Sequence, residues 1–540
     1  MPQLRDSGTR SLHAMEPVPS AEMDGFCRIF GVETEYGVAV TGAERPVDAG
    51  QVAMTMFQPI VSRSRSTNTY LTNGSRLYLD VGSHPEYATA EARDPREALA
   101  QDLAGEHVMR NLALKAQRKL RESYGAHATI HVFKNNVDSA GHAFGCHENY
   151  LVRRFVPLET IEHQLLPFLI TRQLYTGAGR MTPDGFQITQ RADFLDEAVS
   201  SATTRSRPMV NTRDEPHADP DSFRRLHVII GDSNRSQWST WMKLAVTHLV
   251  LCAIEDAFRH GTPSGFEHCA FADPAAANRT VSRFLDDPHA ELTLESGESV
   301  SALGLQRRYY AAVKAFIETH VDALASSLPA TTIDTIMGEW SRVLDALERG
   351  AYDALADRVD WAAKKRLFDA LKRRRPDVTF TQMEQLELDY HDIANGRLYG
   401  SLVARNQMRE LLTGDNVEYA VHNPPTDTRA ALRGRFVDAA LNVGAQFSAD
   451  WYLSPKWMFK ANASVNLNAV NSYDKYDKTG YDKQRAEASL FATVKYRPAK
   501  GLSFAADLRA ESYGQHLTPL IPAFFAEYVL WPQAGLVVKA

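Results

Sequence analysis

The sequence of 540 residues contains little cysteine and no long apolar run. Its four cysteines, Cys27, Cys146, Cys252 and Cys269, are scattered and form no CxxC pair, so neither a disulfide framework nor a cysteine-ligated zinc site is predicted. No run of about 18 apolar residues predicts a membrane helix, and residues 1–26 lack the apolar core of a signal peptide. These absences favour a reducing cytoplasm and a disordered extension at residues 1–26.

Strong net charge and the common nucleotide-binding, hydrolase and metalloprotease motifs are missing as well. The formal net charge is only -6, which gives no electrostatic reason to expect nucleic acid as a partner. The chain has no GxxxxGK[ST] phosphate loop, no GxGxxG, no GxSxG and no HExxH. If it uses ATP, the nucleotide is expected on a sheet that holds Mg²⁺ through carboxylates.

The chain is long enough for more than one domain, and its pattern changes twice. Residues 28–232 mix short strand-like runs with turns, and contain one amphipathic helix at 95–123 with Asp94 as its cap. Residues 238–412 are dominated by helical periodicity.

The last 85 residues alternate with a period of two, which is typical of β-hairpins. One face of the first such strand carries Trp457, Phe459, Ala461, Ala463, Val465 and Leu467. The segment resembles strands of a bacterial outer-membrane β-barrel, although three or four strands are too few to close one.

The first group of possible catalytic residues is GVETEYG at 31–37. On a strand, Glu33 and Glu35 lie on one face about 7 Å apart and repel each other. If that face is covered, the pair needs a cation, and carboxylates are ligands that Mg²⁺ prefers. For an isolated ExE, a solvated strand face is the commoner explanation.

The second group is SRLYLDVG at 75–82. Alternation places Arg76, Tyr78 and Asp80 on one face, and a turn then returns the chain toward Glu86. These types of side chain suit phosphate binding, metal binding and proton transfer. The alternative is an exposed ion pair between Arg76 and Asp80, which leaves Glu86 unexplained.

Two further segments contribute histidines and charges. GCHENY at 145–150 supplies His147 and Glu148, and RRLHVIIGDSN at 224–234 supplies Arg225 and His227. Histidine with glutamate binds metal, and arginine binds phosphate or carboxylate. A lone histidine in such a place is more often structural.

Together the motifs RIFGVETEYG, NGSRLYLDVGSHPEYATAE, FGCHENY, SSATTRSRP and RRLHVIIGDSN resemble the Pup ligase family of actinobacteria, also called proteasome accessory factor A. The resemblance covers about residues 28–451. It implies an α+β fold like that of glutamine synthetase, with a curved antiparallel sheet and helices. The implied division is a catalytic domain at 27–412, the start of a small C-terminal domain at 413–455, and an atypical β-hairpin tail at 456–540 that replaces the rest of that domain.

The resemblance also implies an activity. Members of the family use ATP and Mg²⁺ to phosphorylate the side-chain carboxylate of the C-terminal glutamate of Pup, the prokaryotic ubiquitin-like protein. A lysine of a target protein then attacks and forms an isopeptide bond, which marks the target for the proteasome. The expected partners are therefore Pup and lysine-bearing proteins, and neither nucleic acid nor a membrane is expected despite the tail.

By motif position, the resemblance assigns Asp80 as the catalytic base and Glu33, Tyr78 and Glu86 as magnesium ligands. Arg76, Thr89 and Trp451 match ATP contacts. His147 and His227 fall where related sites place nucleotide or metal ligands.

Two alternatives remain. The sister enzyme of the family, the Pup deamidase or depupylase, has a long insertion between ETEYG and NGxRLY, whereas 35 residues separate Gly37 from Asn73 here. The other alternative, of a different class, is an inactive or membrane-directed fusion whose tail decides its fate.

Overall fold

The computed structural model describes residues 25–64, 66–80, 83–138, 141–200, 207–214, 218–439, 441–454, 456–474, 479–499, 502–513, 516–531 and 536–539. The predicted disordered extension lies almost wholly outside them. The chain forms two compact units, Met1–Gly434 and Arg435–Ala540, and each is described by itself.

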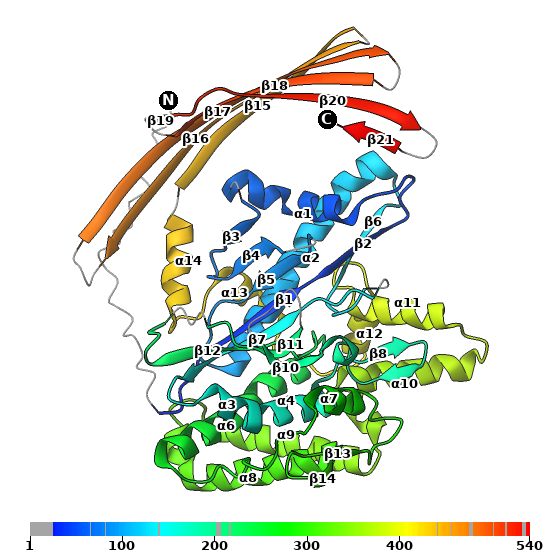
Figure 1. The fold of residues 1–540 in the computed structure, drawn as a ribbon, viewed down its shortest axis with the longest axis vertical. Coiled ribbons are helices and arrows are strands. Elements are labelled where there is room, and N and C mark those ends of the chain that lie inside the picture. Colours follow the sequence, from blue (N-terminus) through cyan, green and yellow to red (C-terminus); the bar gives the residue numbers. More distant parts are fainter. Residues whose placement is uncertain are drawn as a thin grey trace. The chain divides into compact units, whose positions relative to one another are not determined.

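The first unit is built on an eight-stranded sheet with the order β10-β11-β12-β7-β1-β5-β4-β3 (Figure 1). Neighbouring strands are antiparallel except for the pair β10 and β11. The strands are β1 (Phe30–Glu35), β3 (Asn68–Tyr70), β4 (Arg76–Leu79), β5 (Pro85–Ala88), β7 (Cys146–Arg153), β10 (Glu197–Ser200), β11 (Pro208–Asn211) and β12 (Phe223–Val228). The α+β fold with a mainly antiparallel sheet is thus confirmed.

Short hairpins and helices complete this unit. The remaining strands are β2 (Gly37–Thr41), β6 (Thr129–Phe133), β8 (Arg180–Thr182), β9 (Gly185–Gln187), β13 (Glu291–Thr293) and β14 (Ser299–Ser301). The longer helices are α1 (Ala49–Ser64), α2 (Pro95–Tyr124), α6 (Gln237–His260), α7 (Pro274–Ser282), α8 (Ala302–Leu324), α9 (Ala330–Glu348), α10 (Asp360–Arg374), α11 (Phe380–His391), α12 (Leu398–Ala404), α13 (Gly414–His422) and α14 (Arg429–Ala439). The predicted helical region after residue 238 is confirmed.

Helix α2 forms where the sequence predicts it and packs closely on the sheet. The Asp94 carboxylate accepts hydrogen bonds from the backbone N–H groups of Arg96 and Glu97 and caps the helix. At Gly105 the helix approaches β5 so closely that a Cβ atom would lie 2.4 Å from the Tyr87 ring. A glycine is therefore required here for helix and strand to make contact.

The core lies between the sheet and the helices α2, α6, α8 and α9 (Figure 1). Alternate residues of the strands, such as Val32, Tyr150 and Leu226, point into it. Burial of this apolar surface contributes about 25 cal/mol per Å². The other alternate residues of the same strands must face away from the core, which gives the sheet one polar face.

The second unit is a single sheet of five long strands and two short ones. The long strands are β15 (Leu441–Ser454), β16 (Trp457–Asp474), β17 (Thr479–Ala499), β18 (Leu502–Tyr513) and β20 (Ile521–Trp531), and the short ones are β19 (His516–Leu517) and β21 (Leu536–Lys539). The strands follow one another in the order β15-β16-β17-β18-β20-β21, with β19 beside β18. β15 pairs along its length with β16, so residues 441–454 belong to the same sheet as the tail. The division at residue 455 stays a prediction.

Among the helices of the described chain, none combines the length and apolarity that crossing a bilayer requires.

Candidate active site

The polar face of the eight-stranded sheet collects most of the predicted site residues. In the strand registers Glu33 on β1 stands opposite His147 on β7, and Glu35 stands opposite Glu86 on β5. Tyr78 on β4 is in turn paired with Glu86. Directly paired residues of neighbouring strands point to the same face, so the pairing alone brings these side chains together.

Strand β1 is held from its other face. Between the two glutamates, the Thr34 hydroxyl donates a hydrogen bond of 3.2 Å to Asp102 of α2. Asp102 also pairs with Lys134 at 2.6 Å, and all three side chains are buried. This buried contact holds β1 in position against α2. Because Glu33 and Glu35 flank Thr34 on the strand, they then point to the opposite face.

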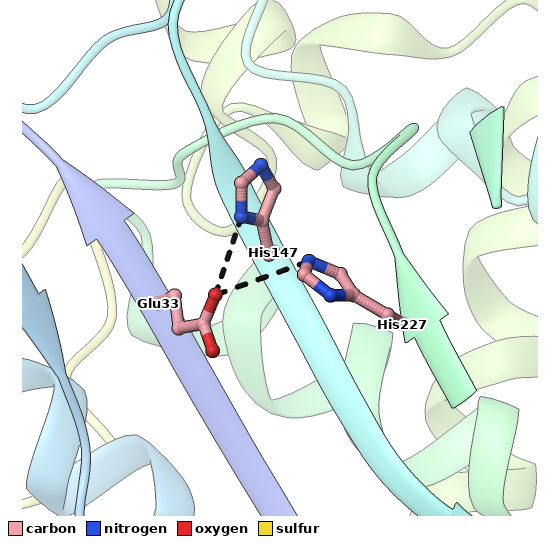
Figure 2. A group of neighbouring side chains, drawn as sticks. All are labelled: Glu33, His147 and His227. Carbon is pink, nitrogen blue, oxygen red and sulfur yellow. Dashed lines mark hydrogen bonds and ion pairs between the residues drawn. The ribbon is translucent and has the colours of Figure 1, made fainter. Parts of the chain in front are cut away.

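Glu33, His147 and His227 form the first cluster (Figure 2). Their ligand atoms all lie within 4.8 Å of one another. The Glu33 Oε2 atom is 3.3 Å from His147 Nδ1 and 3.9 Å from His227 Nε2. One carboxylate and two imidazoles, contributed by three adjacent strands, are a donor set that a divalent cation accepts.

The electrostatics of this cluster fit a cation. Burial would raise the pKa of Glu33, but the hydrogen bond from His147 and the proximity of His227 and Arg225 lower it to about 2. Burial, with His147, lowers the pKa of His227 to about 3. Neither ring nitrogen of His227 has a hydrogen-bond partner among the described residues, although both are buried. A neutral, buried imidazole that makes no hydrogen bond, beside an ionised carboxylate, has the form in which these groups bind metal.

Glu35, Asp80 and Glu86 form the second cluster, and their carboxylate oxygens also lie within 4.8 Å of one another. Three carboxylates this close repel one another, which favours either a bound cation or a retained proton. Asp80 is exposed, and it lies at the turn that joins β4 to β5, where its backbone N–H donates to His84 O at 2.9 Å. The structure therefore places the proposed base at an accessible edge of a carboxylate-rich site.

Tyr78 and Arg76 line the same edge. The Tyr78 hydroxyl donates a short hydrogen bond to Glu86, and burial together with the Glu86 charge raises the pKa of this phenol. The Arg76 guanidinium lies over the Tyr78 ring at 4.7 Å and donates to Asn68 at 2.8 Å. Within the described residues no ion pair joins Arg76 to Asp80, so the simple ion-pair explanation for these two residues was wrong.

Gly145 preserves the space between the two clusters. A Cβ atom at this position would lie 2.3 Å from His147 Nε2 and 2.8 Å from Glu35 Oε1. Any side chain here would displace His147 or occupy the gap that separates the two sets of ligands. This close approach explains why glycine precedes the CHENY segment.

The other predicted residues lie in different places. The Thr89 hydroxyl accepts a hydrogen bond of 3.0 Å from the backbone N–H of Val32, beside the first cluster. Glu148 points to the opposite face, where Arg172 and Tyr150 bind it, so it does not join the site. Trp451 lies on β15 of the second unit, and its proposed contact with a nucleotide stays a prediction.

Two residues had no assigned role in the predicted site. Glu35 completes the second cluster, and Arg225 Nη1 lies 3.6 Å from Glu33 Oε1. The alternation of ETE had already put Glu35 on the right face. For Arg225 the only signal was its position two residues before His227, which puts both on one face of a strand.

The raised pKa of Glu86 predicts a pH effect on stability. Burial and the charges of Glu33 and Glu35 raise it to about 9, against an ordinary value of 4.5. Between these values the folded chain keeps a proton that the unfolded chain has lost, so the contribution of Glu86 to stability falls as the pH rises. With EDTA present, we expect the melting temperature of the wild type to fall more than that of Glu86→Gln between about pH 6 and about pH 8.5. Parallel curves would contradict the retained proton.

Comparison with known proteins identifies the family. A family model described as "Pup-ligase protein" matches residues 28–454. The chain belongs to the Pup-ligase family.

Curated relatives in the Pup-ligase family cover most of the chain. A protein of Bifidobacterium longum strain NCC 2705 named Pup--protein ligase is 98% identical over 451 residues, which are 84% of this chain and 93% of the relative. A Pup--protein ligase of Saccharomonospora viridis is 44% identical over 432 residues, covering 78% of this chain and 92% of the relative. The residues that the family model matches, 28–454, include every predicted site residue from Glu33 to Trp451.

Two solved structures of the family agree with the fold. The complex between the prokaryotic ubiquitin-like protein Pup and its ligase PafA matches with a TM-score of 0.70 and 34% identity, over 85% of this chain and 88% of the other. PafA in complex with ADP matches with a TM-score of 0.63 and 36% identity, over 77% of this chain and 88% of the other.

Proposed function

We propose that this chain is an ATP-dependent Pup--protein ligase. It joins the side-chain carboxylate of the C-terminal glutamate of Pup to a lysine of a target protein through a γ-glutamyl phosphate. The observation that carries the proposal is the pair of clusters on the polar sheet face, Glu33 with His147 and His227, and Glu35 with Asp80 and Glu86. The names of the relatives and the ADP complex of PafA support it.

The carboxylates of the two clusters suit magnesium as the partner of ATP. Carboxylates are the ligands Mg²⁺ prefers, and it usually keeps several waters and bridges protein to phosphate. We propose that Glu33, Tyr78 and Glu86 hold Mg²⁺, with His147 and His227 as further metal or nucleotide ligands, and that Arg76, Thr89 and Trp451 contact ATP. When bound, the metal neutralises charge on the phosphates.

In the first step an oxygen of the Pup glutamate carboxylate attacks the γ-phosphorus of ATP, and ADP leaves. This makes an acyl phosphate, whose phosphate group is a better leaving group than the oxygen of a carboxylate. Arg76 is suited to orient the nucleotide, because its guanidinium is held against Tyr78 and Asn68 with its direction fixed.

In the second step the lysine amine attacks the acyl carbon, a C–N bond forms and phosphate leaves. The amine must lose protons to become the amide nitrogen. Asp80 is exposed at the edge of the site, so a lysine on a protein surface is able to reach it. Asp80 takes the proton.

The test of this function uses the full chain with ATP, Mg²⁺, Pup ending in glutamate and a lysine-bearing protein. The expected result is a product with the added mass of one Pup, which disappears when ATP is omitted. If folded protein forms no conjugate but releases Pup from a preformed one, the depupylase alternative is correct. If it does neither, the inactive-fusion alternative is correct.

A variant tests the metal assignment. Glu33→Ala removes the carboxylate that both histidines approach, and we expect Mg²⁺-dependent ATP affinity to fall by about tenfold or more. Titration calorimetry with and without Mg²⁺ measures this. Glu44→Ala, an exposed glutamate near the end of β2, is the control and should bind as the wild type does. Unchanged affinity in Glu33→Ala would remove Glu33 from the metal site.

A cytoplasmic location is part of the proposal. All four cysteines are free thiols and buried, as in proteins of a reducing compartment. Pup and lysine-bearing proteins are the proposed partners.

A further inference from the structure

In four consecutive rows, the sheet of the second unit has one face without charge. In the strand registers Trp457 stands beside Tyr496, Tyr496 beside Phe504, and Phe504 beside Ala526. The next rows on this face continue the pattern: Trp451, Phe459, Val494, Ala506 and Phe524, then Ala449, Ala461, Ala492, Leu508 and Pro522, then Phe447, Ala463, Leu490 and Ala510. Every residue of these rows is apolar. We call this set the apolar face.

Over these four rows, the charged residues of the same strands point the other way. Asp450 pairs with Lys460 at 3.9 Å, and Lys495 pairs with Glu527 at 3.9 Å. All four stand in register positions that alternate with the apolar face. The sheet therefore has one face suited to water and one that is not.

The apolar face is large. Ten bulky side chains are between 41% and 77% exposed. Seven belong to the apolar face: Phe447, Trp451, Trp457, Leu490, Phe504, Leu508 and Phe524. Three continue it along the same strands: Val465, Leu467 and Tyr528. A large apolar side chain that is half exposed offers roughly 80 Å², so the ten together offer about 800 Å². Exposed apolar patches of this size mark interaction sites.

The area and the lack of charge of this surface limit the kinds of partner that fit it. About 800 Å² from each side is what a standard stable interface buries. A surface without charge offers nothing to a charged partner. Burial of this sheet by itself in lipid is disfavoured as well. Among the described strands, β15 and β21 lie at the two ends of the order, and unpaired strand edges are not tolerated in hydrocarbon.

We propose that the apolar face packs against the same face of a second copy of this chain. Two sheets packed face to face lie about 10 Å apart and interdigitate their inner side chains, while their charged faces stay in water. Such an interface is isologous, so one patch serves both partners and a closed dimer results. This dimer does not depend on the proposed ligase activity.

Neighbouring phenylalanines provide a matched test. Phe524 is 77% exposed on the apolar face, and Phe525 is 52% exposed on the charged face. We expect the full chain to sediment at twice its mass of 60.2 kDa at roughly 0.5 to 50 µM. Phe524→Glu should sediment as a single chain, and Phe525→Glu as a dimer.

A second pair of variants controls for the possibility that a substitution unfolds the sheet locally. Phe504→Glu, on the apolar face, should also give single chains, while Ser503→Glu, its neighbour on the other face, should not. Circular dichroism should show the same strand content in all four variants. Three results would overturn the proposal. The wild type sediments as a single chain over this concentration range, or the two members of each pair sediment with equal mass. The third is a single chain that floats with phosphatidylcholine vesicles.

Discussion

Replacing Asp80 by asparagine is expected to slow Pup conjugation by about 10²- to 10⁴-fold, the usual contribution of a general base. The amide has the shape of the carboxylate but cannot accept a proton from the lysine amine. Asp80 is exposed at the β4–β5 turn, and the turn is held by backbone hydrogen bonds to His84 and Ser83, so folding should be unaffected. The rate of conjugate formation at saturating ATP is the quantity to measure.

Two measurements separate the base from a metal ligand in this variant. ATP affinity should change little, because the proposed ligands Glu33, Tyr78 and Glu86 remain. The lost rate should also be partly regained at high pH, where more of the attacking lysine is already neutral. Asp322→Asn, an exposed aspartate of α8, is the control and should react as the wild type does. Equal rates in Asp80→Asn and wild type would exclude Asp80 as the base.

The largest effect on stability is expected at Glu255, at the centre of a buried ion cluster. Its carboxylate pairs with Arg28 at 2.8 Å and with Arg153 at 3.0 Å. Arg28 is fully buried. Burial would raise the pKa of Glu255, but the two guanidinium groups lower it overall. Removing one partner of such a pair leaves a buried charge uncompensated.

Glu255→Ala is therefore expected to lower the free energy of unfolding by about 3 to 5 kcal/mol. The shift in the urea midpoint of tryptophan fluorescence measures this loss. The matched control is Glu318→Ala, which breaks an ion pair of 4.0 Å between side chains that are 59% and 65% exposed. It should cost less than about 1 kcal/mol. A shift at Glu255 no larger than at Glu318 would contradict the role of the buried cluster.

The elements that local sequence predicted correctly are those with a strong period or a clear cap. Helix α2 follows its Asp94 cap, and β16 presents Trp457 to Leu467 on one face as the alternation requires. The directions of Glu33, Glu35 and Tyr78 also follow from alternation alone. The long motifs of residues 28–234 are also sufficient by themselves to indicate the family.

Which side chains come together in the site depends on how distant strands pair. His147 lies 114 residues after Glu33, and no local pattern states which strand lies beside β1 or in what register. A shift of one residue would turn His147 away and bring Glu148 to the polar face, because side chains alternate strictly. The observed register instead sends Glu148 to Arg172 in the core.

The sequence by itself determined the family, the types of helix and strand, and the face to which each strand residue points. Only the tertiary structure decided which faces meet: it joined Glu35 to Asp80 and Glu86, and it set Glu33 beside His147 and His227. The physical reason is that alternation is a property of one strand, whereas register between distant strands is set by the packing of the whole core.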